Sequence, residues 1–97
     1  MNTILPEELK QRLEQGEALT IVDVREPEET AAGMVAGAVN IPLQELPVRM
    51  AEIPKDRETV LICRSGNRSG RAYEYLASQG YTRIVNMTGG MLAWEQL

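Results

Sequence analysis

The sequence contains no histidine and only one cysteine, Cys63. Without histidine there is no Cys–His or Ser–His pair, which excludes the nucleophile activation used by protease-like and esterase-like enzymes. A single cysteine forms no disulfide within the chain and, with no histidine beside it, does not make an ordinary zinc site. We therefore expect neither a metal nor another cofactor.

Long apolar runs are missing too. No stretch approaches the ~20 residues needed to cross a bilayer, and the N-terminus lacks the charged and then apolar pattern of a secretion signal. These absences predict a cytoplasmic protein with no membrane partner, in a compartment where a free thiol stays reduced.

Positive charge is scarce. Ten lysines and arginines stand against fourteen acidic residues, a net charge of -4, and this balance argues against nucleic acid as a partner. Acidic residues concentrate in residues 7–29, whereas Arg64, Arg68 and Arg71 follow one another closely. We expect this arginine cluster to make the surroundings of Cys63 locally positive, which suits a small anionic substrate.

The length and composition suit one small domain spanning residues 1–97. Short apolar segments alternate with helical patterns, which predicts an α/β fold with a small parallel sheet of about five strands flanked by helices. The strands are expected at residues 2–5, 19–24, 38–42, 59–62 and 83–86. The helices are expected at residues 6–14, 26–32, 43–50 (interrupted by Pro47), 70–79 and 91–94.

The cysteine directly follows the most central of these strands. Thr59-Val60-Leu61-Ile62 is short, rich in β-branched residues and unbroken by polar ones, which is typical of a strand buried on both faces. Cys63 therefore lies where a strand turns into a helix, and the unpaired N–H groups at a helix start favour an anion. A thiol in such a place is favoured as thiolate, with a pKa lowered from about 8.5 to ~3.5–7.5.

The alternative is an inert cysteine that fills the core, which is the commoner role of a lone cysteine. An inert cysteine needs neither the strand-loop-helix context, nor Gly66 within the loop, nor the flanking Arg64 and Arg68. These features favour a reactive Cys63, although each arginine taken alone also fits a solvated surface position.

Four segments in this order resemble the single-domain rhodaneses, a family of sulfurtransferases. They are Asp23-Val24-Arg25, residues 37–42, residues 63–69 and residues 89–94. The sequence departs from the family pattern at Met34-Val35-Ala36, where members commonly carry histidine, isoleucine and proline, and at Thr30, where they carry an aromatic residue. The resemblance implies the three-layer rhodanese-like fold.

The resemblance also implies a two-step sulfur transfer through a persulfide on Cys63. A donor such as thiosulfate gives its outer sulfur to the thiolate, and a thiol or cyanide then accepts it. The implied substrate-binding residues, whose N–H groups hold the terminal sulfur, are Arg64, Ser65, Gly66, Asn67, Arg68 and Ser69. The implied partners are a small anionic sulfur donor and a thiol acceptor, and a protein such as a cysteine desulfurase or thioredoxin fits the same intermediate.

We interpret Asp23 and Arg25 as structural support, an ion-pair frame under the loop in which Glu28 or Glu29 could also pair with Arg25. Gly66, Gly70, Gly89 and Gly90 are expected to serve backbone geometry and close helix packing.

Other functions remain open. A cysteine-dependent phosphatase or arsenate reductase uses a similar loop but places five residues between cysteine and arginine, whereas four separate Cys63 from Arg68. This tighter loop suits a single sulfur atom better than a phosphate. A regulatory binding module without turnover, and a carrier that takes persulfide sulfur from another protein, would keep the same cysteine.

Overall fold

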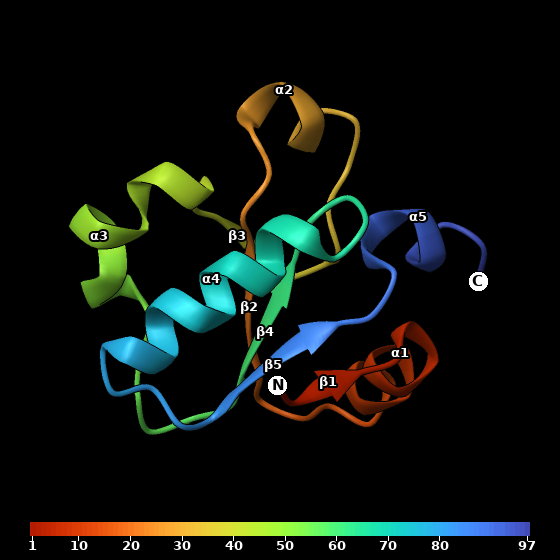
Figure 1. Cartoon of the computed structure of the whole chain (residues 1–97). Coiled ribbons are helices and arrows are strands. Elements are labelled where there is room, and N and C mark those ends of the chain that lie inside the picture. The colour runs from red at the N-terminus through yellow and green to blue at the C-terminus, as the bar shows by residue number, and fades with distance from the viewer.

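The computed structural model describes residues 1–97 as one sheet with helices on both sides (Figure 1). The five strands are all parallel and lie in the order β1-β5-β4-β2-β3. Their bounds are β1 Thr3–Ile4, β2 Thr20–Asp23, β3 Val39–Asn40, β4 Thr59–Ile62 and β5 Ile84–Met87. The predicted fold class is confirmed.

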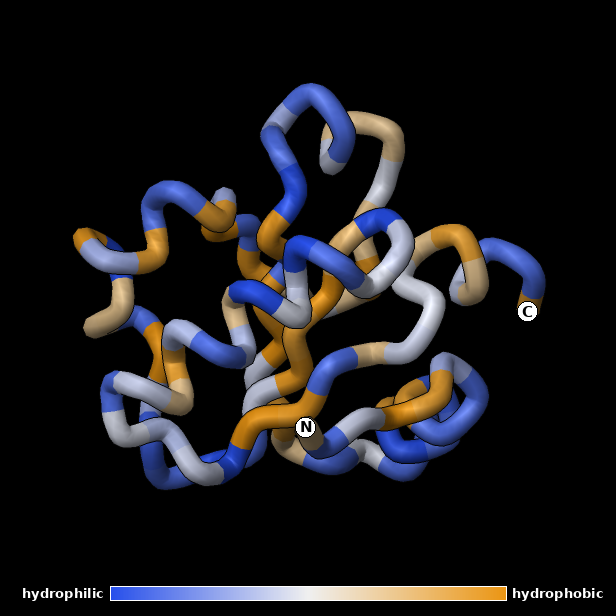
Figure 2. The backbone as a smooth tube through the Cα atoms, in the orientation of Figure 1, coloured by the Kyte–Doolittle hydropathy of each residue, from blue (hydrophilic) through white to orange (hydrophobic).

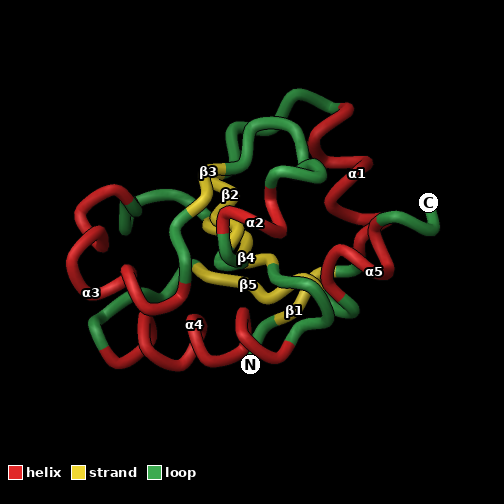
Figure 3. The backbone as a smooth tube through the Cα atoms, turned by 90° about the horizontal axis from the view of Figure 1, so that it is seen from above, coloured by secondary structure: helices red, strands yellow, loops and turns green.

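The helices form the two outer layers. Their bounds are α1 Pro6–Glu14, α2 Pro27–Thr30, α3 Leu46–Arg49, α4 Asn67–Ser78 and α5 Gly90–Trp94. Seen from above, α3 and α4 lie on one side of the sheet, α1 and α5 lie on the other, and α2 lies over the ends of the strands (Figure 3). No helix is both long and apolar enough to span a membrane.

β4 occupies the centre of the sheet, and all four of its residues are buried. Its side chains alternate between two hydrophobic clusters. Val60 and Ile62 pack on the side of α1 and α5, whereas Leu61 and the following Cys63 pack on the side of α4. Accordingly, hydrophobic residues (orange) follow the central strands, and hydrophilic residues (blue) dominate the outer turns (Figure 2). Burial on both faces explains why this strand has no polar alternation.

The segment predicted as one interrupted helix over residues 43–50 is a chain of three short helical pieces. A 3-10 turn at Leu43–Glu45 leads into α3, and a second 3-10 turn follows at Met50–Glu52. Pro47 lies in the first turn of α3, where the missing N–H costs no hydrogen bond.

One helix begins earlier than predicted. α4 starts at Asn67 rather than at residue 70, so Asn67, Arg68 and Ser69 form its first turn. Gly66 precedes them with a φ of 111°, a left-handed conformation that turns the chain from β4 into α4. The polar residues 67–69 carry no apolar periodicity, and the sequence pattern therefore places them in the loop.

Candidate active site

Cys63 follows β4 at the carboxyl edge of the sheet, where segments distant in sequence meet. Asp23, at the end of β2, pairs in register with Ile62, and Asn86 lies in the neighbouring β5. We call residues 63–69 the Cys63 loop, although its last three residues are the first turn of α4. Carboxyl edges of parallel sheets are where α/β proteins bind ligands, so this edge is the candidate active site.

The Cys63 thiol is surrounded by hydrogen-bond donors of its own loop. The Gly66 N–H donates to Sγ at 3.0 Å, and the Ser69 hydroxyl lies 3.3 Å from Sγ. Burial by itself raises the pKa of Cys63, but the Ser69 hydroxyl and the backbone amides of Ser69, Gly66 and Ser65 outweigh it, so the pKa lies below its ordinary value. The loop therefore favours the thiolate without a general base.

The same thiol is almost completely covered, since Cys63 is only 1% exposed. The sequence pattern places Cys63 at a strand-to-helix turn but does not show this burial. The sulfur belongs to the cluster that packs under α4, while the amides beside it point toward it. A molecule that reacts with Sγ therefore needs a local movement that exposes the sulfur.

Ser69 is fully buried, and its hydroxyl has three neighbours that can accept its single proton. They are Cys63 Sγ, the Gly66 carbonyl at 3.2 Å and the Asn86 side-chain oxygen, which is the closest. Asn86 Nδ2 also donates to the Gly66 carbonyl at 3.2 Å. Asn86 was not among the predicted site residues, and the signal that could have found it is a polar residue in a buried strand.

The start of α5 holds the Cys63 loop from the other side. The N–H groups of Met91 and Leu92 donate to the carbonyls of Cys63 and Arg64 at 2.9 and 3.0 Å. Gly90 has a φ of 58°, and a Cβ built on it would lie 2.5 Å from both carbonyl oxygens. Glycine is therefore required where α5 approaches the loop.

The expected ion pair between Asp23 and Arg25 is present beside the loop. Arg25 Nε and Nη2 donate to the carboxylate of Asp23 at 2.8–3.1 Å, and both residues are buried. Arg25 also donates to the main-chain carbonyls of Gly33 at 2.8 Å and Glu29 at 3.4 Å. It thus anchors residues 26–33, which we call the α2 segment.

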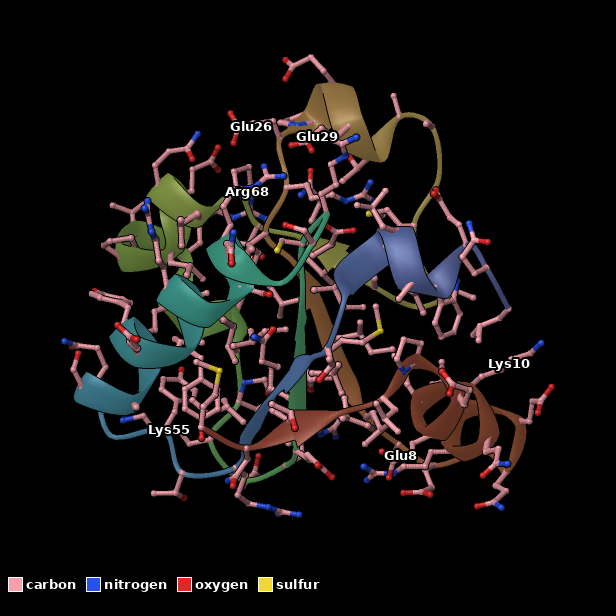
Figure 4. The ribbon with its side chains drawn as sticks, turned by 45° about the vertical axis from the view of Figure 1, so that its right-hand side comes forward. Glu8, Lys10, Glu26, Glu29, Lys55 and Arg68 are labelled. Atoms are coloured by element: carbon pink, nitrogen blue, oxygen red, sulfur yellow. The ribbon has the colours of Figure 1, made fainter.

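The expectation that Glu28 or Glu29 forms an ion pair with Arg25 is wrong. Glu29 instead accepts two hydrogen bonds from Arg68, at 2.6 and 2.8 Å, and a third from the N–H of Glu26 at 3.0 Å. Figure 4 shows Arg68 reaching from α4 to Glu29 on the α2 segment. Arg68 holds the pKa of Glu29 down at about 2, so this carboxylate is charged at neutral pH.

The remaining loop residues differ in exposure. Arg64, Ser65 and Asn67 are exposed, and Arg64 forms no ion pair. Because Glu29 balances Arg68, the uncompensated cation of the Cys63 loop is Arg64. No group of three or more Cys, Asp or Glu side chains is placed to hold a metal ion.

The positions that depart from the family pattern are accommodated locally. Val35 is buried in the cluster beside α1 and α5, whereas Met34 is 39% exposed. The Thr30 hydroxyl lies 3.2 Å from the side-chain oxygen of Asn40. Asn40 in turn donates to the carbonyls of Asp23 and Arg25, both at 2.9 Å, and so steadies the strand end below the loop.

Comparisons with known proteins agree with this geometry. The model of the rhodanese-like domain family matches residues 5–97. A sulfurtransferase of Allochromatium vinosum is 49% identical over 96 residues, which cover 99% of this chain and 90% of the relative. The putative sulfurtransferase YtwF of Bacillus subtilis is 48% identical over 87 residues, covering 90% of this chain and 84% of that protein.

A solved structure agrees as well. The crystal structure of a rhodanese-like domain protein from Staphylococcus aureus superposes with a TM-score of 0.92 at 38% identity. The match covers 97% of this chain and 91% of the other. The five-stranded parallel sheet with its flanking helices is therefore a known fold.

Proposed function

The chain belongs to the rhodanese-like domain family, and from this membership we propose that it is a sulfurtransferase that carries sulfur as a persulfide on Cys63. One observation carries the proposal. The Cys63 thiol lies at the carboxyl edge of the sheet with the Gly66 amide 3.0 Å away and its pKa lowered by the loop. Such a thiol is a nucleophile that needs no histidine.

In the first step we propose thiosulfate as donor. The Cys63 thiolate attacks the outer sulfur, a new S–S bond forms, and the old S–S bond breaks with its electron pair leaving on sulfite. Cys63 then carries a persulfide anion, so that three negative charges enter the step and three leave it. The exposed Arg64 is the group that attracts the anionic donor.

In the second step a thiolate or cyanide attacks the terminal sulfur of the persulfide. The product is an acceptor persulfide or thiocyanate, and the Cys63 thiolate is restored. Between the steps the amides of the Cys63 loop stabilise the negative charge of the terminal sulfur, as backbone donors do for other developing anions. We place the reaction in a reducing compartment such as the cytoplasm, because the thiolate must stay unoxidised.

The experiment is an intact-mass measurement. Incubation with thiosulfate should add one sulfur, about 32 Da, and cyanide or a thiol should remove it. The Cys63→Ala variant should show no addition. An unchanged mass for the wild-type protein would contradict the proposal, and an equal addition to both proteins would contradict the assignment of Cys63.

A parallel assay separates the competing readings. If thiosulfate adds nothing but a persulfide-bearing protein does, Cys63 is a carrier rather than a thiosulfate enzyme. Hydrolysis of a phosphate ester that disappears in Cys63→Ser would support the phosphatase reading instead. We expect no such hydrolysis, because only four residues separate Cys63 from Arg68.

A further inference from the structure

Arg68 lies in the first turn of α4, beside the candidate site, and its guanidinium is already bound to a carboxylate. Its two terminal nitrogens donate to the two carboxylate oxygens of Glu29, at 2.6 and 2.8 Å. This fork is the geometry in which arginine holds a carboxylate or another planar anion most strongly. Any anion that is to bind Arg68 in the same way must compete with Glu29.

Glu29 is held in place from its own side as well. Its Oε1 accepts the N–H of Glu26, the residue that precedes α2, so the carboxylate both caps α2 and binds Arg68. Glu26 lies beside the pair and is itself bound by Gln44, whose Nε2 donates to Glu26 Oε1 at 3.1 Å (Figure 4). The Glu29 carboxylate is therefore held in place next to Arg68 by hydrogen bonds from both sides.

The pair is near the reacting sulfur and open to water. Arg68 directly precedes Ser69, whose hydroxyl lies 3.3 Å from Cys63 Sγ, so the first turn of α4 that carries Arg68 lies beside the thiol. The side chains of Arg68 and Glu29 are 33% and 30% exposed, so an incoming donor meets both charges. Glu28 is also exposed on the same short helix, and it forms no ion pair.

From this arrangement we infer that Glu29 lowers the preference of the site for doubly charged sulfane donors over singly charged ones, by neutralising Arg68. The inference rests on the proposed function. Glu29 cancels the attraction of Arg68 for an anion, and because this attraction is proportional to donor charge, its loss weakens the binding of a dianion twice as much as that of a monoanion. Glu29 acts here through Arg68 and is a positioning residue, because its carboxylate binds Arg68 and the Glu26 N–H rather than the sulfur.

Two small donors differ in charge while sharing the chemistry. Thiosulfate carries two negative charges and leaves as sulfite. Methanethiosulfonate, in which a methyl group replaces one oxygen, carries one charge and leaves as methanesulfinate. In both cases the Cys63 thiolate takes the outer sulfur and the leaving group departs with the electron pair. With cyanide as acceptor both donors yield thiocyanate, so one assay measures kcat/KM for each.

The test compares the two donors in wild-type protein and in Glu29→Gln. Removing the charge should raise kcat/KM by about tenfold for thiosulfate and by about threefold for methanethiosulfonate, because the electrostatic energy is proportional to donor charge. The gain for thiosulfate should shrink as ionic strength rises. Glu28→Gln is the matched control, one residue away with the same change of charge, and it should alter the ratio of the two donors by less than twofold.

Glu29→Asp separates charge from packing. It keeps the negative charge, so the ratio of the two donors should stay at the wild-type value even if both rates fall. The ratio is independent of how much of a variant is folded, so a destabilised variant still gives an answer. A ratio unchanged in Glu29→Gln, or shifted equally in Glu29→Asp, would overturn the inference and leave the sulfurtransferase proposal standing. Failure of both donors to sulfurate the wild-type protein would overturn both.

Discussion

Two arginine–carboxylate forks hold the α2 segment over the Cys63 loop, and they differ in burial. Arg25 pairs with Asp23, and these side chains are 7% and 0% exposed. Arg68 pairs with Glu29, and these side chains are 33% and 30% exposed. The chemistry of the two forks is the same, so the difference between them is one of environment.

The environment decides what each pair can do. In the buried pair, loss of one partner leaves the other charge without water and without compensation, which is strongly destabilising. Arg25 also binds two main-chain carbonyls of the α2 segment, so it belongs to the framework. In the half-exposed pair, water and dissolved anions can replace either partner at small cost. The first fork is therefore fixed, and the second is open to exchange.

The largest effect should come from breaking the buried fork. Asp23→Asn keeps the shape of the side chain but leaves Arg25 as an uncompensated buried charge. We expect the free energy of unfolding to fall by about 3–5 kcal/mol, measured by urea denaturation. Glu28→Gln removes a carboxylate from the surface and is the control. A loss below about 1 kcal/mol would show that the carbonyl partners of Arg25 suffice without Asp23.

The buried contact between the Ser69 hydroxyl and Cys63 Sγ tests whether an uncharged hydrogen-bond donor also has a large effect when it is buried. Ser69→Ala removes the hydroxyl that lies 3.3 Å from Cys63 Sγ. The pKa of Cys63 should rise by about one unit or more, because hydrogen bonds to charged groups contribute about 1.5–3 kcal/mol. The pH dependence of iodoacetamide alkylation measures this pKa. Ser65→Ala, at an exposed side chain, should leave it unchanged. Equal profiles for the two variants would assign the effect to backbone amides alone.

The half-exposed fork should contribute less to stability. Glu29→Gln should lower the free energy of unfolding at neutral pH by about 1 kcal/mol. Because Arg68 lowers the pKa of Glu29 from 4.5 to about 2, this contribution is complete above pH 4.5 and disappears as the pH falls toward 2. The difference between wild type and variant, followed by denaturation across that window, should shrink with acid. A difference that grows instead would contradict the pairing.

The smallest effect should come from the pairs whose carboxylates are the most exposed, since Glu45 and Glu52 are 45% and 48% exposed and Arg49 is 31% exposed. Arg49 pairs with Glu45 and Glu52 on the surface, at 3.2 and 2.8 Å. Exposed pairs of this kind typically contribute only a few tenths of a kcal/mol each, so Arg49→Gln should lower the thermal midpoint by less than Glu29→Gln does. A decrease as large as that of Glu29→Gln would show that exposure does not separate these pairs.

Much of the fold follows from local sequence. The apolar run 59–62 predicts the buried central strand, and Pro6 with the acidic residues after it predicts α1 with the bounds that the structure has. The apolar pattern predicts a start of α4 that is three residues too late. That boundary depends on the left-handed Gly66 and on hydrogen bonds across the loop, which a one-dimensional pattern of apolar residues does not record.

In the candidate site, too, local sequence predicts some of the residues and misses others. Cys63, its loop and the Asp23–Arg25 pair were identified from residues close together in the chain. Asn86 and the partner of Glu29 were not. Arg68 and Glu29 are separated by 39 residues, and Glu29 has Arg25 only four positions away, so sequence proximity favours the wrong arginine.

The amino-acid sequence by itself determined the strand that leads into Cys63, the glycine that turns the chain, and the absence of histidine and of a second cysteine. These are properties of neighbouring residues, and neighbours set backbone conformation directly. Only the tertiary structure decided that the thiol is covered and that Glu29 neutralises Arg68. Both depend on how α2, α4 and β5 pack, because burial and ion pairing are set by distances in space between segments that lie far apart along the chain.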